Sequence, residues 1–187
     1  MRQHVCPWWG GYFIDNRLRR WLHPPERILG PYVRPGMAAM DFGCGMGFFA
    51  IAMAHLVGAE GRVTAVDLQQ EMLDVLERRA AKAKVDDRIR THRSVADAIG
   101  LAEPHDFVLA FYSAHEVPGA ARWFAEVRGL LRPQGTLLLV EPVGHVTAAH
   151  FQRMLDVADH AGFRPEERPR ILLSHAALLV ASPGPNA

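Results

Sequence analysis

The chain has 187 residues, 49% of them hydrophobic and 22% charged, which is enough for one domain with a sizeable buried core. Its 21 basic and 20 acidic residues leave a net charge of +1, which argues against a strongly electrostatic nucleic-acid binder. The amino terminus lacks the apolar core of a signal peptide, and the apolar-rich stretch 46–59 is too short to cross a bilayer. The cysteines, Cys6 and Cys44, lie too far apart in sequence to suggest a disulfide framework or a metal knuckle. We therefore expect a cytoplasmic protein with no membrane partner.

Residues 1–35 form an aromatic-rich, partly helical leader, in which the rings at positions 8–13 are too dense for a solvated tail. The leader has two interpretations. It is a lid that closes over a ligand, with a hinge at residues 10–11, or its rings pack on a sheet edge or in a dimer interface. A short helix with Ile14, Leu18, Trp21 and Leu22 on one side is expected to follow. Residues 36–187 are expected to form the main domain, within a single globular unit.

From residue 36 onward, short apolar runs alternate with longer amphipathic segments, which is the pattern of βαβ units in a mostly parallel sheet. Strands are predicted at residues 37–42, 62–66, 89–93, 107–111 and 136–141, and helices at 48–57, 70–83, 120–131 and 147–161. Two further strands are expected around Phe163 and at 171–181. The gap between them is too short for a helical crossover, so they should form an antiparallel hairpin at the sheet edge. The predicted class is therefore α/β, with seven strands in a doubly wound, mostly parallel sheet.

Three alternate glycines, Gly43, Gly45 and Gly47, stand where the first strand turns into the first helix. Glycine permits positive φ angles and lets backbone N–H groups approach a ligand, and a helix amino terminus favours negative charge. Asp67 ends the next strand, 20 positions beyond Gly47, where its carboxylate can accept hydrogen bonds from a ribose diol. Together these features predict a nucleotide-containing cofactor.

The glycine spacing is G-x-G-x-G, and Asp41 stands two positions before it. In this combination the chain resembles the class I S-adenosylmethionine-dependent methyltransferase family, over about residues 36–181. The resemblance implies a Rossmann-like fold, S-adenosylmethionine as cofactor and S-adenosylhomocysteine as product. It places the glycine loop beside the methionine part of the cofactor, with Asp41 orienting that loop and the cofactor amino group. Asp67 would bind the ribose, and Leu68 would lie next to the adenine.

Later segments extend the resemblance. Residues 94–97 resemble the family segment whose aspartate reaches the adenine amino group, which gives that role to Asp97 and places Ala96 beside it. Phe111 ends the strand that resembles the family's fourth, and it is assigned to the cofactor site as well. Residues 130–138 are close to the family's turn into strand five, and the closing hairpin matches its reversed last strand. These motifs point to the fold and the cofactor but say nothing about the acceptor.

Candidate catalytic residues follow strands four and five, because open α/β sheets bind ligands at the carboxyl ends of their strands. They are Tyr112, Ser113, His115, Glu116, Glu141 and His145. His115 and Glu116 are the most suggestive pair, since histidine titrates near neutral pH and a carboxylate can orient it or contact an amine. The alternative is a structural loop in which His115 bonds to backbone and Glu116 is solvated or caps a helix. No metal site is predicted, because the acidic pattern of magnesium-dependent methyltransferases is missing.

The leading hypothesis is an S-adenosylmethionine-dependent methyltransferase that acts on a small-molecule acceptor, because no large insertion between strands leaves room for a substrate domain. Two alternatives stay open: a non-catalytic S-adenosylmethionine-binding regulatory subunit and an NAD-dependent oxidoreductase. The glycine spacing and the terminal hairpin disfavour the oxidoreductase. A homodimer is compatible with the sequence.

Overall fold

Seven strands in the part of the chain that the computed structural model describes, residues 17–182, form a mostly parallel sheet in the order β3-β2-β1-β4-β5-β7-β6. The chain divides into two compact units, Met1–Ser94 and Val95–Ala187. The predicted α/β class, with a reversed last strand, is confirmed. The predicted boundary after residue 35 stays a prediction.

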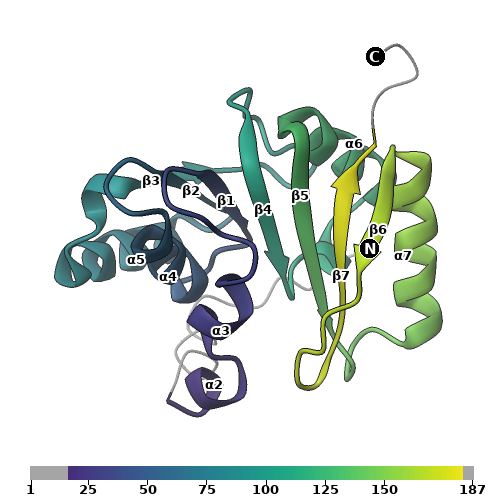
Figure 1. Ribbon diagram of the computed structural model, residues 1–187, viewed down its shortest axis with the longest axis horizontal. Coiled ribbons are helices and arrows are strands. Elements are labelled where there is room, and N and C mark those ends of the chain that lie inside the picture. Colours follow the sequence, from purple (N-terminus) through teal and green to yellow (C-terminus); the bar gives the residue numbers. More distant parts are fainter. Residues whose placement is uncertain (1–16, 183–187) are drawn as a thin grey trace. The chain divides into compact units, whose positions relative to one another are not determined.

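The first unit is a three-stranded parallel sheet with helices packed on it (Figure 1). Its elements are α2 (Arg17–Leu22), α3 (Pro25–Leu29), β1 (Ala38–Phe42), α4 (Phe48–Val57), β2 (Arg62–Asp67), α5 (Gln70–Ala83), the 3-10 turn η2 (Asp86–Arg88) and β3 (Ile89–Arg93). Helix α4 packs on β1 and β2, and α5 packs on β2 and β3. Strands β1 and β2 are buried along nearly their whole length, as expected for strands covered on both faces.

Helices α4 and α5 begin and end at the predicted residues. Met72, Val75 and Leu76 of α5 are buried, as expected for the apolar face of an amphipathic helix. The helix ends at Lys84, which takes the left-handed conformation (φ 58°) and donates its N–H to carbonyls of the last turn. Helix α4 is apolar on nearly all sides and is correspondingly buried.

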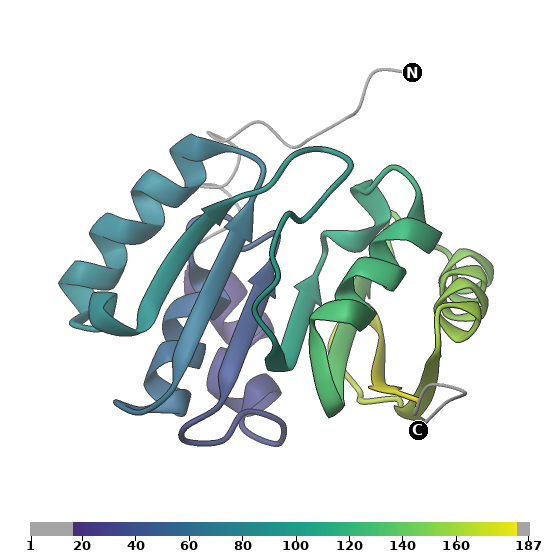
Figure 2. The same cartoon turned by 90° about the horizontal axis from the view of Figure 1, so that it is seen from above.

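The second unit has one parallel and two antiparallel strand pairs. Its elements are β4 (His105–Phe111), the 3-10 turn η3 (Ala114–Glu116), α6 (Ala120–Leu130), β5 (Leu131–Pro142), α7 (Ala148–His160), β6 (Phe163–Glu167) and β7 (Ser174–Ala181). Strand β4 pairs with β5 in parallel, and β7 lies antiparallel between β5 and β6, which confirms the predicted hairpin. Helices α6 and α7 pack side by side (Figure 2).

Strand β5 begins five residues before its predicted start at residue 136, because Leu131 already pairs with His105 of β4. The register then shifts, so that Phe107 pairs with Thr136. Residues 132–135 of β5 lie between the two pairs and form an irregularity in the strand. Gln134 takes a positive φ of 65° within this segment. The strand closes with the fully buried run Leu137–Glu141, whose last residue is charged.

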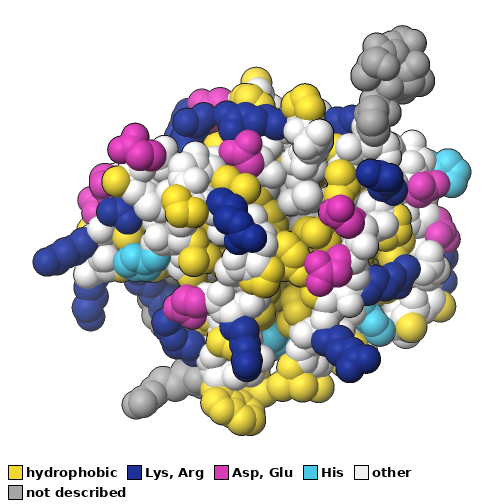
Figure 3. Space-filling model, in the orientation of Figure 1, with side chains coloured by type: hydrophobic (Ala, Val, Ile, Leu, Met, Phe, Trp, Pro, Cys, Tyr) yellow, Lys and Arg dark blue, Asp and Glu magenta, His cyan; other side chains and the backbone are white. Residues whose placement is uncertain are grey.

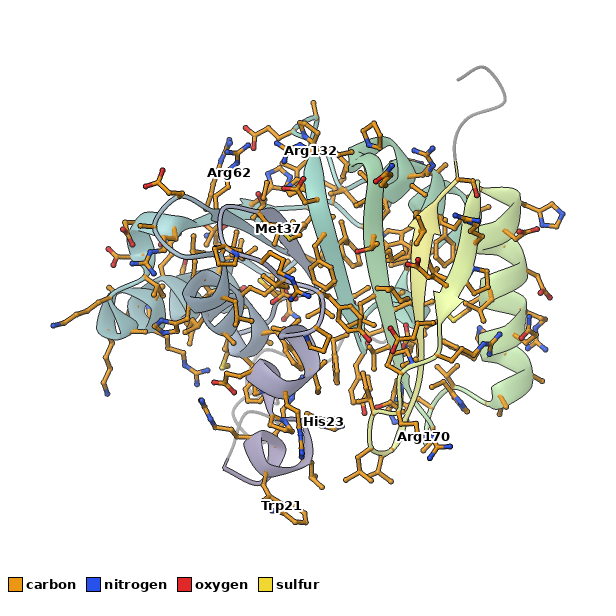
Figure 4. All side chains as sticks on the ribbon, viewed as in Figure 1. Trp21, His23, Met37, Arg62, Arg132 and Arg170 are labelled. Carbon is orange, nitrogen blue, oxygen red and sulfur yellow. The ribbon has the colours of Figure 1, made fainter. Side chains whose placement is uncertain are left out.

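Trp21 differs from its expected place on the apolar side of a helix. Its side chain is 75% exposed and extends away from α2 (Figure 4). His23, just after the helix, is buried instead. The aromatic residues at positions 8–13, on which the lid interpretation rests, lie outside the described residues.

The surface carries charges of both signs. On the face shown in Figure 3, basic and acidic side chains are interspersed with apolar ones. No helix within residues 17–182 combines the length and the apolar character needed to cross a membrane.

Candidate functional site

The three glycines between β1 and α4 all take positive φ angles: 70° at Gly43, 52° at Gly45 and 86° at Gly47. Side chains rarely tolerate this conformation, so the turn requires glycine. A Cβ atom on Gly47 would lie 2.7 Å from Cγ of Leu76, which explains this glycine by packing against α5. A Cβ atom on Gly45 would meet nothing within 4 Å, so the backbone of Gly45 borders open space that a ligand can enter.

Asp67, at the end of β2, is bonded to this loop. Its Oδ2 accepts a hydrogen bond from the Gly45 N–H (2.9 Å), and its Oδ1 accepts one from the Gln69 N–H (2.9 Å). Burial raises the pKa of Asp67, and these two amides oppose the rise. Each carboxylate oxygen has a second lone pair, so Asp67 can hold the loop and still accept a hydrogen bond from a hydroxyl.

Asp41, in the middle of the buried run of β1, is 2% exposed. Burial raises its pKa from the usual 3.8 to about 7, opposed mainly by the charge of Arg19 and reinforced by that of Asp67. Its carboxylate accepts a hydrogen bond from the Ala50 amide, but Oδ2 has no hydrogen-bond partner among the described residues. A buried oxygen without a partner is costly, and an ammonium group would satisfy it. The residues present therefore fit the amino-acid end of S-adenosylmethionine.

The other predicted cofactor residues lie just after β2, at the end of β4 and in an exposed turn. Leu68 directly follows β2 and is half-buried, and Phe111 is buried at the end of β4. Ala96 and Asp97 are exposed in a turn that the Val95–Ala98 bridge closes. Asp97 pairs with Arg122 at 3.3 Å, so its assignment to adenine rests on the resemblance alone.

The first unit thus brings together Asp41, the three glycines, Asp67 and Leu68. The second unit contains Ala96, Asp97 and Phe111, together with both predicted catalytic residues. Cys44 between the glycines is buried, and burial raises the pKa of its thiol, as expected of a packing residue and not of a reactive thiolate.

His115 is held by a buried carboxylate. Its Nδ1 lies 2.5 Å from Oε2 of Glu141, and its backbone N–H donates to Oε1 of Glu141 at 3.1 Å. Glu141 is completely buried, whereas the side chain of His115 is 15% exposed. The two bonds fix both the imidazole and the 3-10 turn that carries it. Nε2, the other ring nitrogen, takes part in neither bond.

The predicted partner of His115, Glu116, is not the carboxylate that orients the ring. Neighbouring residues on a tight turn project in different directions, so Glu116 is exposed while His115 faces Glu141 across from β5. The charge of Glu116 still contributes to raising the pKa of His115. A direct catalytic role for Glu116 stays a prediction.

The pKa of His115 is raised above its ordinary value of 6.5, first by the hydrogen bond to Glu141 and then by the charges of Glu141 and Glu116, while burial opposes the rise. The ring of His145 stands edge-on to it, with centroids 6.2 Å apart. A raised pKa makes His115 a stronger base in its neutral form. Within residues 17–182, no three His, Cys, Asp or Glu side chains are grouped so that they could hold a metal ion.

Tyr112, between β4 and this turn, has a positive φ of 62°. Its N–H donates to the Val140 carbonyl, and its hydroxyl lies 2.7 Å from Oγ of Ser174. A bulky residue keeps this conformation only when its surroundings impose it, and such strain gathers at functional sites. The conformation of Tyr112 therefore supports the prediction that the carboxyl end of β4 belongs to the site.

Two residues of these sites were not assigned from the sequence. Glu141 was a candidate without a role, although a charge at the end of an apolar strand signals that a buried partner is needed. Arg19 was not a candidate, since nothing in the sequence distinguishes it from the neighbouring arginines Arg17 and Arg20.

The methyltransferase domain family matches residues 39–135, more than half of the chain, and the chain belongs to this family. S-adenosylmethionine is the cofactor that family and fold imply, which confirms the predicted cofactor.

Among curated proteins, the chain is 30% identical to the demethylmenaquinone methyltransferase of Lactobacillus johnsonii over 112 residues, which cover 58% of this chain and 45% of that protein. It is 28% identical to the Staphylococcus aureus demethylmenaquinone methyltransferase over 109 residues, which cover 58% of this chain and 44% of that protein. The matched segments span slightly less than half the length of these relatives.

Among solved structures, the fold is similar to that of a SAM-dependent methyltransferase from Aquifex aeolicus, with a TM-score of 0.86 and 20% identity, covering 95% of this chain and 100% of that chain. It is also similar to an arsenic(III) S-adenosylmethionine methyltransferase from Chlamydomonas reinhardtii, with a TM-score of 0.65 and 19% identity, covering 81% of this chain and 65% of that chain. These likenesses define the fold. Only the second of these names specifies an acceptor, and a shared fold does not define the acceptor.

Proposed function

We propose that the chain is an enzyme that transfers a methyl group from S-adenosylmethionine to a small molecule whose nucleophilic atom carries a proton. The observation that carries the acceptor chemistry is the contact between His115 and the fully buried Glu141. A carboxylate fixed behind an imidazole is a recurring arrangement for a general base.

The cofactor, when bound, supplies an electrophilic methyl group on a sulfonium. In the first unit, Asp67 binds the ribose diol while it holds Gly45, and Asp41 binds the ammonium group. Leu68 lies next to the adenine, and the open side of Gly45 gives the ligand close access to the backbone. Fixing a ligand at several points accelerates a displacement because the reacting atoms no longer need to find their alignment.

In the second unit, His115 accepts the acceptor's proton at Nε2. Bound S-adenosylmethionine would supply the methyl group that the acceptor oxygen or nitrogen takes up as it loses this proton, and S-adenosylhomocysteine would be left as the product. The carboxylate of Glu141, bonded at Nδ1, stabilises the imidazolium that forms. Tyr112, fixed by Ser174, and the ring of His145 are further candidates for contact with the acceptor.

The acceptor class is tested by a panel of phenols, carboxylates, thiols and amines, together with a demethylmenaquinone analogue chosen from the names of the relatives. Release of S-adenosylhomocysteine is the measurement. We expect turnover with at least one hydroxyl-bearing member, and none without acceptor. Turnover confined to thiolates, which need no base near neutral pH, would contradict the role of His115. No turnover in any arm, combined with copurification of a second protein, would favour the regulatory-subunit alternative.

We also propose a cytoplasmic location. The balanced charge of the chain supports the further proposal that it has no nucleic-acid partner. A homodimer stays open and is decided by measuring the molar mass in solution.

A further inference from the structure

Two neighbouring loops of the second unit expose large aliphatic side chains. Leu172 and Leu173, in the loop between β6 and β7, are 53% and 58% exposed, and Val143, just after β5, is 46% exposed. The Val143 N–H donates to the Leu173 carbonyl at 3.1 Å, so the two loops are in contact. We call these three residues the apolar tip. Exposed apolar side chains that gather in this way mark a surface that binds a partner.

The backbone of the apolar tip is held in place. Ser174 donates its N–H to the Ile171 carbonyl (3.2 Å) and its Oγ–H to the Leu172 carbonyl (3.0 Å). With the bond from Val143 to Leu173, three consecutive carbonyls of the loop accept hydrogen bonds. Leu173 takes a left-handed φ of 55°, which glycine or asparagine would adopt at lower cost. The turn therefore does not explain the leucine, and such an outlier points to a use for its side chain.

The charged side chains of the two loops are basic. Arg168 and Arg170 precede the exposed leucines and are exposed themselves, and Figure 4 labels Arg170 in this loop. Residues 143–147, between β5 and α7, contain no aspartate or glutamate. The nearest acidic residues along the chain, Glu166 and Glu167, lie before the loop in β6. Aliphatic side chains flanked by arginines are complementary to an anionic lipid surface, because the apolar groups enter the interface while the guanidinium groups meet the head groups.

We propose that the apolar tip docks the protein on an anionic lipid surface. This goes beyond the proposed methyl transfer and does not depend on it. A small molecule is held in a concave site that covers most of its surface, whereas the side chains of the tip are 46% or more exposed. A second copy of the chain would need to bury about 800 Å² on each partner, which three side chains do not supply. The sequence predicted no membrane partner because no segment is long enough to span a bilayer, and surface docking needs no such segment.

The experiment is cosedimentation of the full chain with vesicles of phosphatidylcholine alone and of phosphatidylcholine mixed with phosphatidylglycerol. We expect the parent to bind the mixed vesicles about tenfold more tightly, and high salt to remove most of this difference. Leu173→Asn should weaken binding to the mixed vesicles about tenfold, the effect of withdrawing one partly buried leucine. Its melting temperature should equal or exceed that of the parent, because asparagine tolerates the left-handed conformation. Arg170→Gln should weaken binding to the mixed vesicles about fivefold and leave binding to the neutral ones unchanged.

Two variants of the same unit are matched controls. Val95→Ser removes an apolar side chain that is 61% exposed in a turn outside the tip, and Arg164→Gln removes an exposed cation of β6. Both should bind the vesicles as the parent does. Losses in these controls as large as those of Leu173→Asn and Arg170→Gln, or a parent that binds neither kind of vesicle, would overturn the proposal. A parent dimer that Leu173→Asn dissociates would also overturn it, because the tip would then contact a second copy of the chain.

Discussion

Asp41→Asn is expected to weaken binding of S-adenosylhomocysteine by about 10- to 100-fold at pH 8 and, at the same pH, to stabilise the ligand-free protein. The first effect follows because an amide cannot neutralise the ligand ammonium. The second follows because Asp41 is buried, with one oxygen lacking a partner. Asp41 therefore lowers the stability of the ligand-free protein but strengthens ligand binding, a combination that is common at functional sites.

The stabilisation should depend on pH. Burial raises the pKa of Asp41 in the folded state to about 7, well above its usual value of 3.8. Below about pH 4, Asp41 is protonated in both the folded and the unfolded state and costs no stability. From about pH 4 to pH 7 the unfolded state loses the proton that the folded state keeps, so the free energy of unfolding falls, and above pH 7 the loss levels off. By pH 8 the cost approaches about 4 kcal/mol as an upper limit, and asparagine does not incur it.

Thermal unfolding of the ligand-free parent and variant from pH 5 to pH 8 measures this difference. The gain in melting temperature of Asp41→Asn should grow with pH and level off above about pH 7. Asp74→Asn, which changes an exposed carboxylate of α5, is the control and should give no comparable trend. A gain that stays constant over this range would contradict the raised pKa of Asp41.

His115→Asn is expected to reduce turnover about 100-fold or more on an acceptor identified by the panel, with affinity for S-adenosylhomocysteine nearly unchanged. The reason is that proton transfer acts in the chemical step, whereas the cofactor is assigned to other residues. The measurement is kcat by S-adenosylhomocysteine release, together with a calorimetric titration of the same variant. Parental turnover by His115→Asn would mean that the reaction needs no base from this residue.

Glu141→Gln should move the pH profile as well as lower the rate. Only neutral His115 can act as base, so the rate rises with pH through the pKa of His115, which Glu141 raises. Removing the carboxylate lowers that pKa and shifts the rising limb to lower pH, a change that a merely structural role for Glu141 would not produce. Glu116→Gln, at an exposed carboxylate, should shift the limb in the same direction but less. A loss of turnover as large as that of His115→Asn would give Glu116 a direct catalytic role.

Local sequence patterns predicted much of the secondary structure of the first unit. The bounds of α4 and α5 follow from amphipathic spacing and from glycines beside their ends, which are properties of adjacent residues. The left-handed turn at Gly43, Gly45 and Gly47 also has local causes. The start of β5 could not be predicted in the same way, because pairing with His105 of β4 extends the strand back to Leu131.

The carboxylate that bonds to His115 could not be predicted from spacing in the sequence. Histidine and glutamate at 115 and 116 are adjacent in sequence, but their side chains project apart on the turn, and the bonded carboxylate comes from 26 residues further along the chain. The position of Arg19 over the Phe48 ring likewise could not be predicted from the sequence. Such partners depend on which elements pack together, and no single segment contains that information.

A calorimetric titration of the parent chain with S-adenosylhomocysteine and, separately, with NAD decides which cofactor the glycine loop and Asp67 bind. We expect one saturable site per chain for S-adenosylhomocysteine, with micromolar affinity of the kind usual for small ligands, and no saturable heat with NAD. Saturable NAD binding with no response to S-adenosylhomocysteine would contradict this expectation and would assign the glycine loop and Asp67 to a dinucleotide.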